Sequence, residues 1–531
     1  MEEVRQEISV AVRRARSLNW YIYLVVFLLC IFFYTRYNDF PENYHPDEPS
    51  KVRQLRKGTY NFHHPLLLVN ATRAIYFAGH KLDKNITRLI AGRFTSALFA
   101  GCAVLCFMGI AHLFMGKWAA LVVGLTTCLC PLLLTNAHYM KEDTPFLLGL
   151  AGTMLVTVMY TKKPSGGAAA LFGIMSGIMA SSKYIGVIAP LMALCIIIWS
   201  SLWTSVRTLW KHLLCFMTVL LFILFTLNYQ LFLNFGLFIK GLNFEMDHVM
   251  GGRRGLKTRY FSTFYFRVIF NSTIYLVIIL AIMYYAFLVI DWRKRSIAEK
   301  IIAVSPFVYY LFVSISSVQY ARYILPVVVM LHYMAGLAVV FLADRIRSGN
   351  YFKSVFTAGI TTILVVWLGV YCIDYMQQFK NDSRERLEKW IVNNMSHTAR
   401  IVQDNCAGLP KEMALNNGEK RRHIRIDSKW SVGMLEDLEH ARQLGYTHVV
   451  VCSLRYDKFF QPGVYPCPTE KDTYNCAYGK DFYIELFEKG ELVWEAIPKR
   501  PMDGYTNPVI KLYRIDNDRE GADSPENPEV D

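Results

Sequence analysis

The sequence predicts an α-helical polytopic membrane protein with a small α/β or α+β domain at its C-terminal end. Of its 531 residues, 53% are hydrophobic and 14% are aromatic. The apolar residues form repeated runs that are too long for the helices of a soluble core. From Lys380 onward the composition becomes that of an ordinary soluble chain. The membrane part therefore comes first and the soluble part last.

The formal net charge of +15 belongs to the membrane part. From Lys380 onward the chain has 22 Lys and Arg against 26 Asp and Glu. A basic surplus confined to a membrane domain argues against a nucleic-acid partner. Positive charge in a membrane protein is instead typical of short cytoplasmic loops and of sites for phosphate-bearing substrates. We therefore expect membrane lipids around this part and no nucleic acid.

Repeated apolar runs predict about eleven transmembrane helices. Residues 1–19 carry four arginines and no cleavage signal, so we expect a cytoplasmic leader. With that end inside, the basic loops between runs all fall on the inner side, as the positive-inside rule requires. The predicted spans of the membrane domain, residues 20–376, are 20–36, 88–114, 117–135, 144–161, 166–182, 184–204, 212–234, 270–290, 300–318, 323–343 and 354–376.

An odd number of spans places three polar loops on the outer face, together with everything after the last span. These loops are 39–84, 136–143 and 240–267. The sequence shows no repeat of 20–50 residues and no inverted pair of broken apolar segments. A solenoid or a secondary transporter would be expected to show such features. The polar clusters therefore share one face.

Residues 377–516 are expected to form the soluble domain, followed by an acidic, disordered tail over 517–531. The apolar patterns predict strands at 447–454, 482–487 and 509–515, and a helix at 435–444. None of the twelve cysteines has CxxC or Cys/His metal spacing. Within the tail, Cys467 and Cys476 predict a local disulfide. Cys406 and Cys452 could form a second bridge, or Cys452, in a predicted core strand, could simply be buried.

Two adjacent carboxylates, Asp47 and Glu48, follow the first apolar run. The following residues predict a short helix that ends at Gly58, because proline suits the first helical turn and glycine the stop. At a helix N-terminus the dipole and the free N–H groups favour an ionised carboxylate, which can accept a proton. The alternative is that the pair only caps a surface helix.

A second polar cluster, Lys141–Glu142–Asp143, lies where one span leaves the membrane and the next enters. It repeats the carboxylate pair on the same face, although capping of the following helix would also explain it. His63 and His64 add imidazoles that can donate to an anion, or that serve only the loop's structure. These two clusters are candidates for an outer-face site.

Three cations, Arg93, Lys183 and Arg322, lie at or near the outer ends of separate spans. Together they suggest a phosphate pocket, whereas snorkelling anchors at the interface are the alternative for each. The outer loop 240–267 contains a Gly-rich, basic centre at 251–255. This centre is either a mobile segment that closes over an anionic group or a solvated loop.

In this order and spacing, the motifs resemble those of the dolichyl-phosphate-mannose protein mannosyltransferase superfamily, which includes bacterial phospholipid-carrier-dependent glycosyltransferases. The resemblance covers roughly residues 20–345 and is strongest over 44–145. This sequence has His63–His64–Pro65 where the related aminoarabinose transferases have a lysine followed by two prolines. The motifs that carry the resemblance are the Asp-Glu pair, HHPL, RxxSA, KEDTP, SKYxG and RYxLP.

The resemblance implies a GT-C glycosyltransferase fold. Its expected reaction moves a sugar, of the mannosyl or hexosyl type, from dolichyl or undecaprenyl phosphate to an outer-face protein, lipid or glycan acceptor, with inversion. It implies a bacterial cytoplasmic membrane with an outward-facing site, or alternatively the endoplasmic reticulum membrane with a lumenal site. The scheme requires no cofactor and no metal, although carboxylates could bind one. The competing interpretation is a transporter or flippase of a lipid-linked sugar.

Transfer from a sugar phosphate needs a base for the acceptor hydroxyl and cations for the departing phosphate. We expect Asp47 to be the base, with Glu48 orienting it or binding sugar. The residues expected to bind the donor phosphate are His64, Arg93, Lys183 and Arg322. The residues expected to shape the acceptor or sugar site are His63, Lys141, Glu142 and Asp143.

Overall fold

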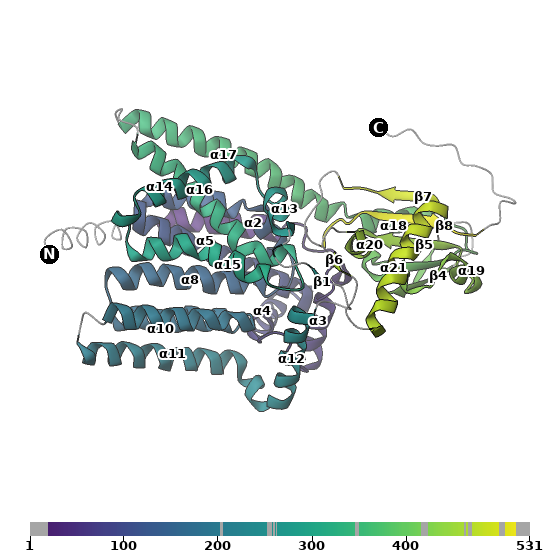
Figure 1. Cartoon of the computed structure of the whole chain (residues 1–531), viewed down its shortest axis with the longest axis horizontal. Coiled ribbons are helices and arrows are strands. Elements are labelled where there is room, and N and C mark those ends of the chain that lie inside the picture. Colours follow the sequence, from purple (N-terminus) through teal and green to yellow (C-terminus); the bar gives the residue numbers. More distant parts are fainter. Residues whose placement is uncertain are drawn as a thin grey trace. The chain divides into compact units, whose positions relative to one another are not determined.

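A computed structural model gives the fold of the chain, which forms two compact units (Figure 1). The first, the helical unit, consists of Met1–Arg253, Lys257–Lys380 and Pro501–Thr506, and the second, the α/β unit, holds the remainder. The residues that the structure describes are 20–201, 205–251, 257–258, 261, 263–345, 350–415, 423–460, 464–465, 470–498 and 505–516.

The helical unit is built almost entirely from helices. Its four short 3₁₀ turns are η1 (Glu42–Tyr44), η2 (Tyr184–Val187), η3 (Trp292–Lys294) and η4 (Ala321–Ile324), and its short strand is β1 (Lys257–Thr258). Its α-helices are α2 (Trp20–Thr35), α3 (Glu48–Lys57), α4 (Leu67–Leu82), α5 (Arg88–Met115), α6 (Lys117–Cys128), α7 (Pro131–Ala137), α8 (Asp143–Lys162), α9 (Gly166–Ala180), α10 (Ile188–Ser201), α11 (Val206–Leu233), α12 (Phe235–Gly251), α13 (Phe264–Asn271), α14 (Tyr275–Ile290), α15 (Ile297–Ser314), α16 (Leu325–Arg345) and α17 (Asn350–Lys380).

The length and composition of these helices confirm a polytopic membrane protein. Six of the described helices are long and apolar enough to cross a membrane, or up to eight if each bent pair is one span. The bent pairs are α6 with α7, at 63°, and α13 with α14, at 112°. Shorter apolar helices also occupy the predicted spans at 20–36, 166–182 and 184–204. The number of about eleven spans stays a prediction.

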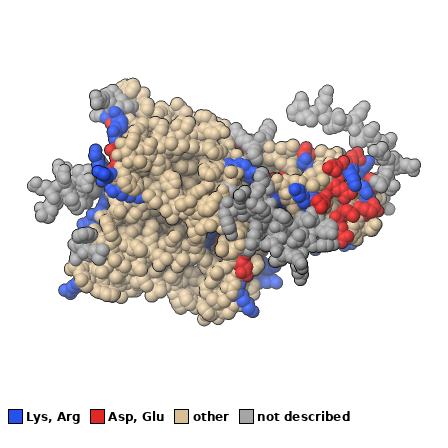
Figure 2. Space-filling model, viewed as in Figure 1, with Lys and Arg blue, Asp and Glu red and all other residues tan. Residues whose placement is uncertain are grey.

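Close packing of small residues holds the long helices together. A Cβ added to Gly149 of α8 would lie 2.5 Å from the backbone nitrogen of Met179 at the end of α9. Such close approach is typical of membrane helices, where packing replaces the hydrophobic effect. In Figure 1, α8, α10 and α11 lie side by side as long helices. On the face shown in Figure 2, most of the helical unit's surface carries no Lys, Arg, Asp or Glu, as contact with lipid requires.

Two of the polar loops contain helices that the sequence patterns did not predict. The loop 39–84 contains the expected short helix α3, but also α4, and α12 occupies the first half of the loop 240–267. Most of the Gly-rich centre of the latter loop lies outside the described residues. The predicted leader and acidic tail lie outside them as well.

The α/β unit is built around one sheet. Its helices and short turns are α18 (Ser383–Asn394), η5 (Asn405–Ala407), η6 (Val432–Met434), α19 (Leu438–Gln443), α20 (Ser453–Phe460) and α21 (Glu470–Lys489). Its strands are β2 (Arg400–Asp404), β3 (Glu412–Ala414), β4 (His423–Lys429), β5 (His448–Cys452), β6 (Val464–Tyr465), β7 (Glu491–Ala496) and β8 (Ile510–Arg514).

Six of these strands form a mixed sheet in the order β3-β4-β2-β5-β8-β7. Strand β2 pairs in parallel with β4 and β5, and the remaining pairs are antiparallel. Alternating residues of β5 face opposite sides: Val449 and Val451 pack with α19 and α21, and Val450 and Cys452 lie in the core that includes α18. The sheet therefore has helices on both faces (Figure 1). Its mixed strand directions agree with the small α/β or α+β domain that the sequence predicted.

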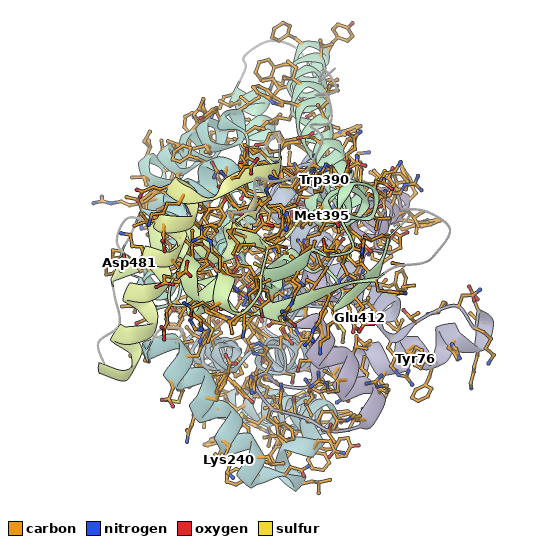
Figure 3. The ribbon with its side chains drawn as sticks, turned by 90° about the vertical axis from the view of Figure 1, so that its right-hand side faces the viewer. Tyr76, Lys240, Trp390, Met395, Glu412 and Asp481 are labelled. Carbon is orange, nitrogen blue, oxygen red and sulfur yellow. The ribbon has the colours of Figure 1, made fainter. Side chains whose placement is uncertain are left out.

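One strand prediction in this unit is wrong. Residues 482–487 belong to the helix α21, on which Figure 3 labels the exposed Asp481. Phe482, Tyr483 and Leu486 are all buried, and only a helical period places them on one face. Tertiary burial thus overrides the β-propensity of neighbouring aromatic residues. The strands predicted at 447–454 and 509–515 and the helix at 435–444 correspond to β5, β8 and α19.

The structure has both Cys406 and Cys452 as free thiols. The two side chains are neighbours, and burial raises the pKa of Cys452 well above its ordinary value. The alternative of a buried thiol at Cys452 therefore describes this structure, and the second bridge is not formed in it. Cys467 and the side chain of Cys476 lie outside the described residues, so their disulfide stays a prediction.

Candidate active site

The site is organised around the start of α3. Asp47 occupies the N-cap position of this helix, a proline lies in the first turn, and Gly58 ends the helix at φ 68°. Left-handed backbone of this kind suits glycine at a helix C-terminus. The Asp47 side chain accepts no hydrogen bond from its own helix. Its carboxylate instead forms an ion pair with Lys141, from the second polar cluster.

Glu48 and Arg93 form a fully buried pair beside it. Both side chains have 0% exposure, and the guanidinium lies 3.5 Å from the centre of the Phe40 ring. Each of its five N–H groups meets an acceptor, and Glu48 also accepts from the backbone N–H of Met140 at 2.8 Å. Arg93 thus has no N–H left for a phosphate. The acceptors of Arg93 are Glu48 Oε1 at 3.0 Å and Oε2 at 2.6 Å, and the carbonyls of Asn38, Phe40 and Pro41 at 2.7, 2.6 and 3.3 Å.

Amines and carboxylates alternate around Asp47. Lys51, one helical turn further along α3, donates to Glu142 Oε2 at 2.8 Å and to the Met140 carbonyl at 3.1 Å. Lys141 Nζ lies between Asp47 and Glu142, at 3.5 Å from the latter's Oε2. The Asp47 side chain is 38% exposed, whereas that of Glu142 is 3% exposed. Asp47 is therefore the carboxylate of this group that a substrate can reach.

The surrounding cations keep both carboxylates ionised. Burial alone would raise the pKa of Asp47, but Lys141 and more distant cations hold it well below its ordinary value. Glu142 is similar: burial would raise its pKa, but Lys51 and Lys141 together lower it below its ordinary value. Burial lowers the pKa of Lys51, whereas Asp47 raises that of Lys141 despite burial. At neutral pH we therefore expect two carboxylates and Lys141 to be charged.

Two histidines border this group in the neutral form. The backbone N–H of Asp47 donates to His45 Nδ1 at 3.2 Å, which leaves Nε2 as the protonated nitrogen. Burial holds the pKa of His45 well below its ordinary value and lowers that of His64 to about 3. His64 Nε2 lies 3.8 Å from Glu142 Oε2. His45 therefore fixes the backbone of the reachable carboxylate.

Lys183 and Arg322 both form cation–π contacts with the ring of Tyr323. Lys183 Nζ is 5.5 Å and the Arg322 guanidinium 5.4 Å from the centre of Tyr323, and Lys183 also pairs with Asp143 Oδ1 at 2.5 Å. Among the described residues, none donates to the buried Asp143 Oδ2. Within the same residues, Arg322 has no hydrogen-bonded acceptor and is flanked by aromatic rings, Tyr320 being 4.3 Å away. These groups can receive a ligand.

Two residues of α12 contact His63, at the edge of the site. Glu245 Oε1 lies 3.5 Å from His63 Nδ1, and the ring of Phe244 lies 4.3 Å from that of His63. Gly241 allows this approach, because a Cβ there would lie 2.5 Å from the Phe62 carbonyl. Burial raises the pKa of Glu245 to about 7. Figure 3 labels Lys240 on the same helix.

The structure thus brings together most of the residues that the sequence predicted for the site. Asp47, Lys141, Glu142 and His64 form one group, and Asp143, Lys183 and Arg322 form the next. Sequence reasoning assigned no role to His45, Lys51 or Glu245. The position of Lys51 four residues after Asp47 was a usable signal for a shared helix face. Within the described chain, no group of three or more His, Cys, Asp or Glu side chains is arranged to hold a metal ion.

Residues 78–228 match the family model of the dolichyl-phosphate-mannose-protein mannosyltransferases. The match spans α5 and α8 and includes Arg93, the second polar cluster and Lys183. It confirms the predicted resemblance and the class of enzyme, a membrane glycosyltransferase. No relative is found among curated proteins.

Several solved structures are similar to this chain at low identity. ArnT from Cupriavidus metallidurans bound to undecaprenyl phosphate is 14% identical, with a TM-score of 0.47, over 93% of this chain and 98% of that one. The Archaeoglobus fulgidus oligosaccharyltransferase in complex with Zn and sulfate is 10% identical, with a TM-score of 0.44, over 93% and 73%. The protein O-mannosyltransferase complex of S. cerevisiae bound to the sugar donor is 19% identical, with a TM-score of 0.31, over 43% and 34%.

Proposed function

We propose that this membrane glycosyltransferase takes its sugar from a polyprenyl phosphate and transfers it directly to a hydroxyl group of an acceptor. The observation that carries the proposal is the position of Arg322. Its guanidinium has no acceptor among the described residues, and it shares the Tyr323 ring with Lys183. A half-buried guanidinium whose N–H groups have no acceptor carries an unsatisfied hydrogen-bonding potential, so a site of this kind favours an anionic ligand. The phosphate of the donor supplies such an anion.

Asp47 is the general base in this proposal. It is ionised, it is the most exposed carboxylate of its group, and His45 fixes its backbone. When the acceptor oxygen attacks the anomeric carbon, its proton moves to Asp47. The bond between that carbon and the phosphate oxygen breaks, and the electron pair stays on the phosphate. One displacement inverts the anomeric centre.

The cations have two different tasks. Lys183 and Arg322 hold the phosphate and stabilise the negative charge that grows on it as the bond breaks. Lys141 holds Asp47 in place and keeps it ionised in the resting site. The phosphodiester of the bound donor adds one negative charge near this cation, which raises the proton affinity of Asp47 when a base is required. Arg93 is not part of the proposed phosphate pocket, because each of its N–H groups already donates to an acceptor within the protein.

The sugar or acceptor meets the acidic and imidazole side chains around these cations. The unpartnered Asp143 Oδ2 can accept a hydroxyl hydrogen bond. His63 and Glu245 offer a second polar edge, and the Phe244 ring beside them provides an apolar surface. His64 and Glu142 complete the arrangement as a neutral donor and an ionised acceptor. Glu48 acts indirectly, by fixing Arg93 and the start of α3.

The test follows a labelled sugar. Purified protein in lipid nanodiscs is incubated with mannosyl dolichyl phosphate or its undecaprenyl counterpart, with membranes of the source cell as acceptors. We expect label to leave the lipid phosphate. Arg322→Ala should raise the apparent donor KM about tenfold or more, and Arg322→Lys should raise it less, because a cation remains without the planar fork.

Arg345→Ala is the matched control. It removes a cation from the other end of α16, where Arg345 pairs with Asp291 at 3.1 Å. Its donor kinetics should equal those of the parent at equal thermal stability. Label that stays on the lipid phosphate with every donor and acceptor, yet crosses a vesicle membrane, would overturn the proposal in favour of a flippase.

A further inference from the structure

A short stretch of the C-terminal part of the chain belongs to the helical unit. Residues 501–506 group with that unit, although the strands β7 and β8 that precede and follow them belong to the α/β unit. Of this stretch the structure describes Tyr505 and Thr506. No predicted motif includes either residue. Their contacts place them at the site around Asp47.

The Tyr505 ring contacts both halves of the site. Its centre lies 4.5 Å from that of the His45 ring, in an edge-to-face arrangement at 65°. The Arg322 guanidinium lies 6.0 Å from the same ring centre. His45 accepts a hydrogen bond from the backbone of Asp47. One aromatic ring therefore touches the imidazole that fixes the base and the guanidinium proposed to bind phosphate.

Thr506 holds this ring in position. Its hydroxyl forms a short hydrogen bond with the hydroxyl of Tyr139, whose ring lies 4.8 Å from that of His45. The next residue, Asn507, has a positive φ of 46° and is fixed within the α/β unit. Its backbone N–H donates to Asp382 Oδ2 at 2.7 Å, and its side-chain oxygen accepts from the Ser383 N–H at 2.8 Å. Consecutive residues are thus anchored in different units.

The Tyr505 ring differs from the two other aromatic neighbours of Arg322 in where it comes from along the chain. Tyr320 and Tyr323 lie beside it in sequence, whereas Tyr505 comes from a distant part of the chain. A cation over an aromatic face is stabilised by about 0.5 to 2 kcal/mol, depending on its exposure to water. The ring of Tyr505 therefore limits the positions that the guanidinium can take before any ligand arrives.

We propose that Tyr505 is a positioning residue for the donor phosphate, through which the C-terminal part of the chain completes the site. It holds Arg322 in the orientation that receives the phosphate of a polyprenyl-phosphate sugar, and it supports His45 behind the base. This inference rests on the proposed function for the identity of the ligand. It assigns to Tyr505 no direct contact with the reacting atoms.

The decisive comparison is between Tyr505→Ala and Tyr505→Phe. Removing the ring should raise the apparent donor KM between about twofold and thirtyfold, the fold-change that corresponds to a cation–π contact, with kcat changing less than KM. Phenylalanine keeps the ring and should retain donor kinetics close to those of the parent. The same order should appear when undecaprenyl phosphate alone is titrated and binding is followed by the rise in melting temperature.

Tyr76→Ala is the matched control. Tyr76 is a partly buried tyrosine of the helical unit, labelled on α4 in Figure 3, and it stacks on His80 at 5.1 Å. Its removal should change neither donor KM nor lipid-phosphate binding. Tyr505→Ala could instead lose stability as much as a Tyr139→Phe variant does, without a change in donor KM. Tyr505 would then be only a packing residue, and the inference would be overturned.

The two proposals fail in different ways. If the parent transfers sugar and Tyr505→Ala does so with unchanged donor KM, the positioning role is lost and the proposed function stands. If the parent transfers no sugar but binds undecaprenyl phosphate, and Tyr505→Ala weakens that binding, the proposed transfer reaction is lost and the phosphate role stands. A Tyr505→Phe variant as impaired as Tyr505→Ala would also overturn the inference, because the ring alone would then not suffice.

Discussion

Asp47 in the helical unit and Asp404 in the α/β unit are two carboxylates held by opposite means. Asp404 is fully buried at the end of β2. It accepts from the backbone N–H groups of Val432 and Cys452, at 2.8 and 2.9 Å, and from the Tyr483 hydroxyl at 2.8 Å. Burial raises its pKa to about 6. The pKa of Asp47 moves in the other direction, because Lys141 and more distant cations together outweigh burial.

The two carboxylates serve different roles in their units. Neutral donors around Asp404 tie the end of β2 to η6, to the end of β5 and to α21. The role of this carboxylate is therefore to hold these elements together. The Lys141 cation beside Asp47 fixes the charge of a side chain that remains reachable from outside. Burial by itself does not decide the ionisation state; the charge of the nearest donors does.

Replacing Asp47 by Asn should produce the largest effect. The change is nearly isosteric and removes the basic oxygen, so we expect turnover to fall by about 10²- to 10⁴-fold. Transfer of labelled sugar by the purified variant measures this, with thermal stability as the check on folding. Near-parent turnover would show that Asp47 is not the base, and the contrast between a reactive Asp47 and a structural Asp404 would no longer hold.

Glu48→Gln should affect stability more than chemistry. It leaves the Arg93 charge buried without its counter-charge, and breaking a buried pair in this way costs about 3 to 5 kcal/mol. We expect a clear drop in melting temperature in detergent. Residual folded protein should keep the donor KM of the parent. A stable variant with a raised donor KM would instead indicate that this pair contacts the phosphate.

Asp404→Asn should destabilise the α/β unit without altering the chemistry of the helical unit. Asparagine has one acceptor oxygen, so at least one of the three donors loses its partner, at about 1 to 3 kcal/mol. Chemical denaturation, followed by the fluorescence of the Trp residues of this unit, gives the change in stability. Turnover per folded molecule should equal that of the parent, and a selective loss of kcat would show that Asp404 does more than hold the sheet.

The pH dependence of stability gives the smallest and sharpest test. A carboxyl whose pKa rises from 3.8 to about 6 on folding binds its proton more tightly when folded. Its contribution is therefore fully present below the unfolded pKa and is lost as pH rises through about 6. Relative to Asp404→Asn, the parent should gain about 1 kcal/mol between pH 7 and pH 5.

Asp47 should show no such change in that window. Its lowered pKa makes its contribution present above the unfolded value and lost only as pH falls through the folded value, which lies well below 3.8. The parent and Asp47→Asn should therefore differ by the same free energy of unfolding at pH 7 and pH 5. A pH-dependent difference for Asp47 and none for Asp404 would reverse the comparison.

The sequence predicted most of the membrane part because long apolar runs have few alternative structures in lipid. The long helices α5 and α11 lie where the runs at 88–114 and 212–234 predicted them. The helices α4 and α12 were missed, because they lie in loops that were recognised by their polar residues. Residues 482–487 were assigned to a strand, although α21 buries them as a helix.

By itself, the sequence determined the acids and cations of the site and the loops that carry them, since ionisable groups next to apolar runs need a partner or a function. Only the tertiary structure decided which of them pair. Arg93 forms a fully buried ion pair with Glu48, whereas Arg322 has no acceptor among the described residues. Tyr505, from the C-terminal part of the chain, packs against His45. Pairing depends on distances between segments remote in sequence, and no local pattern encodes those distances.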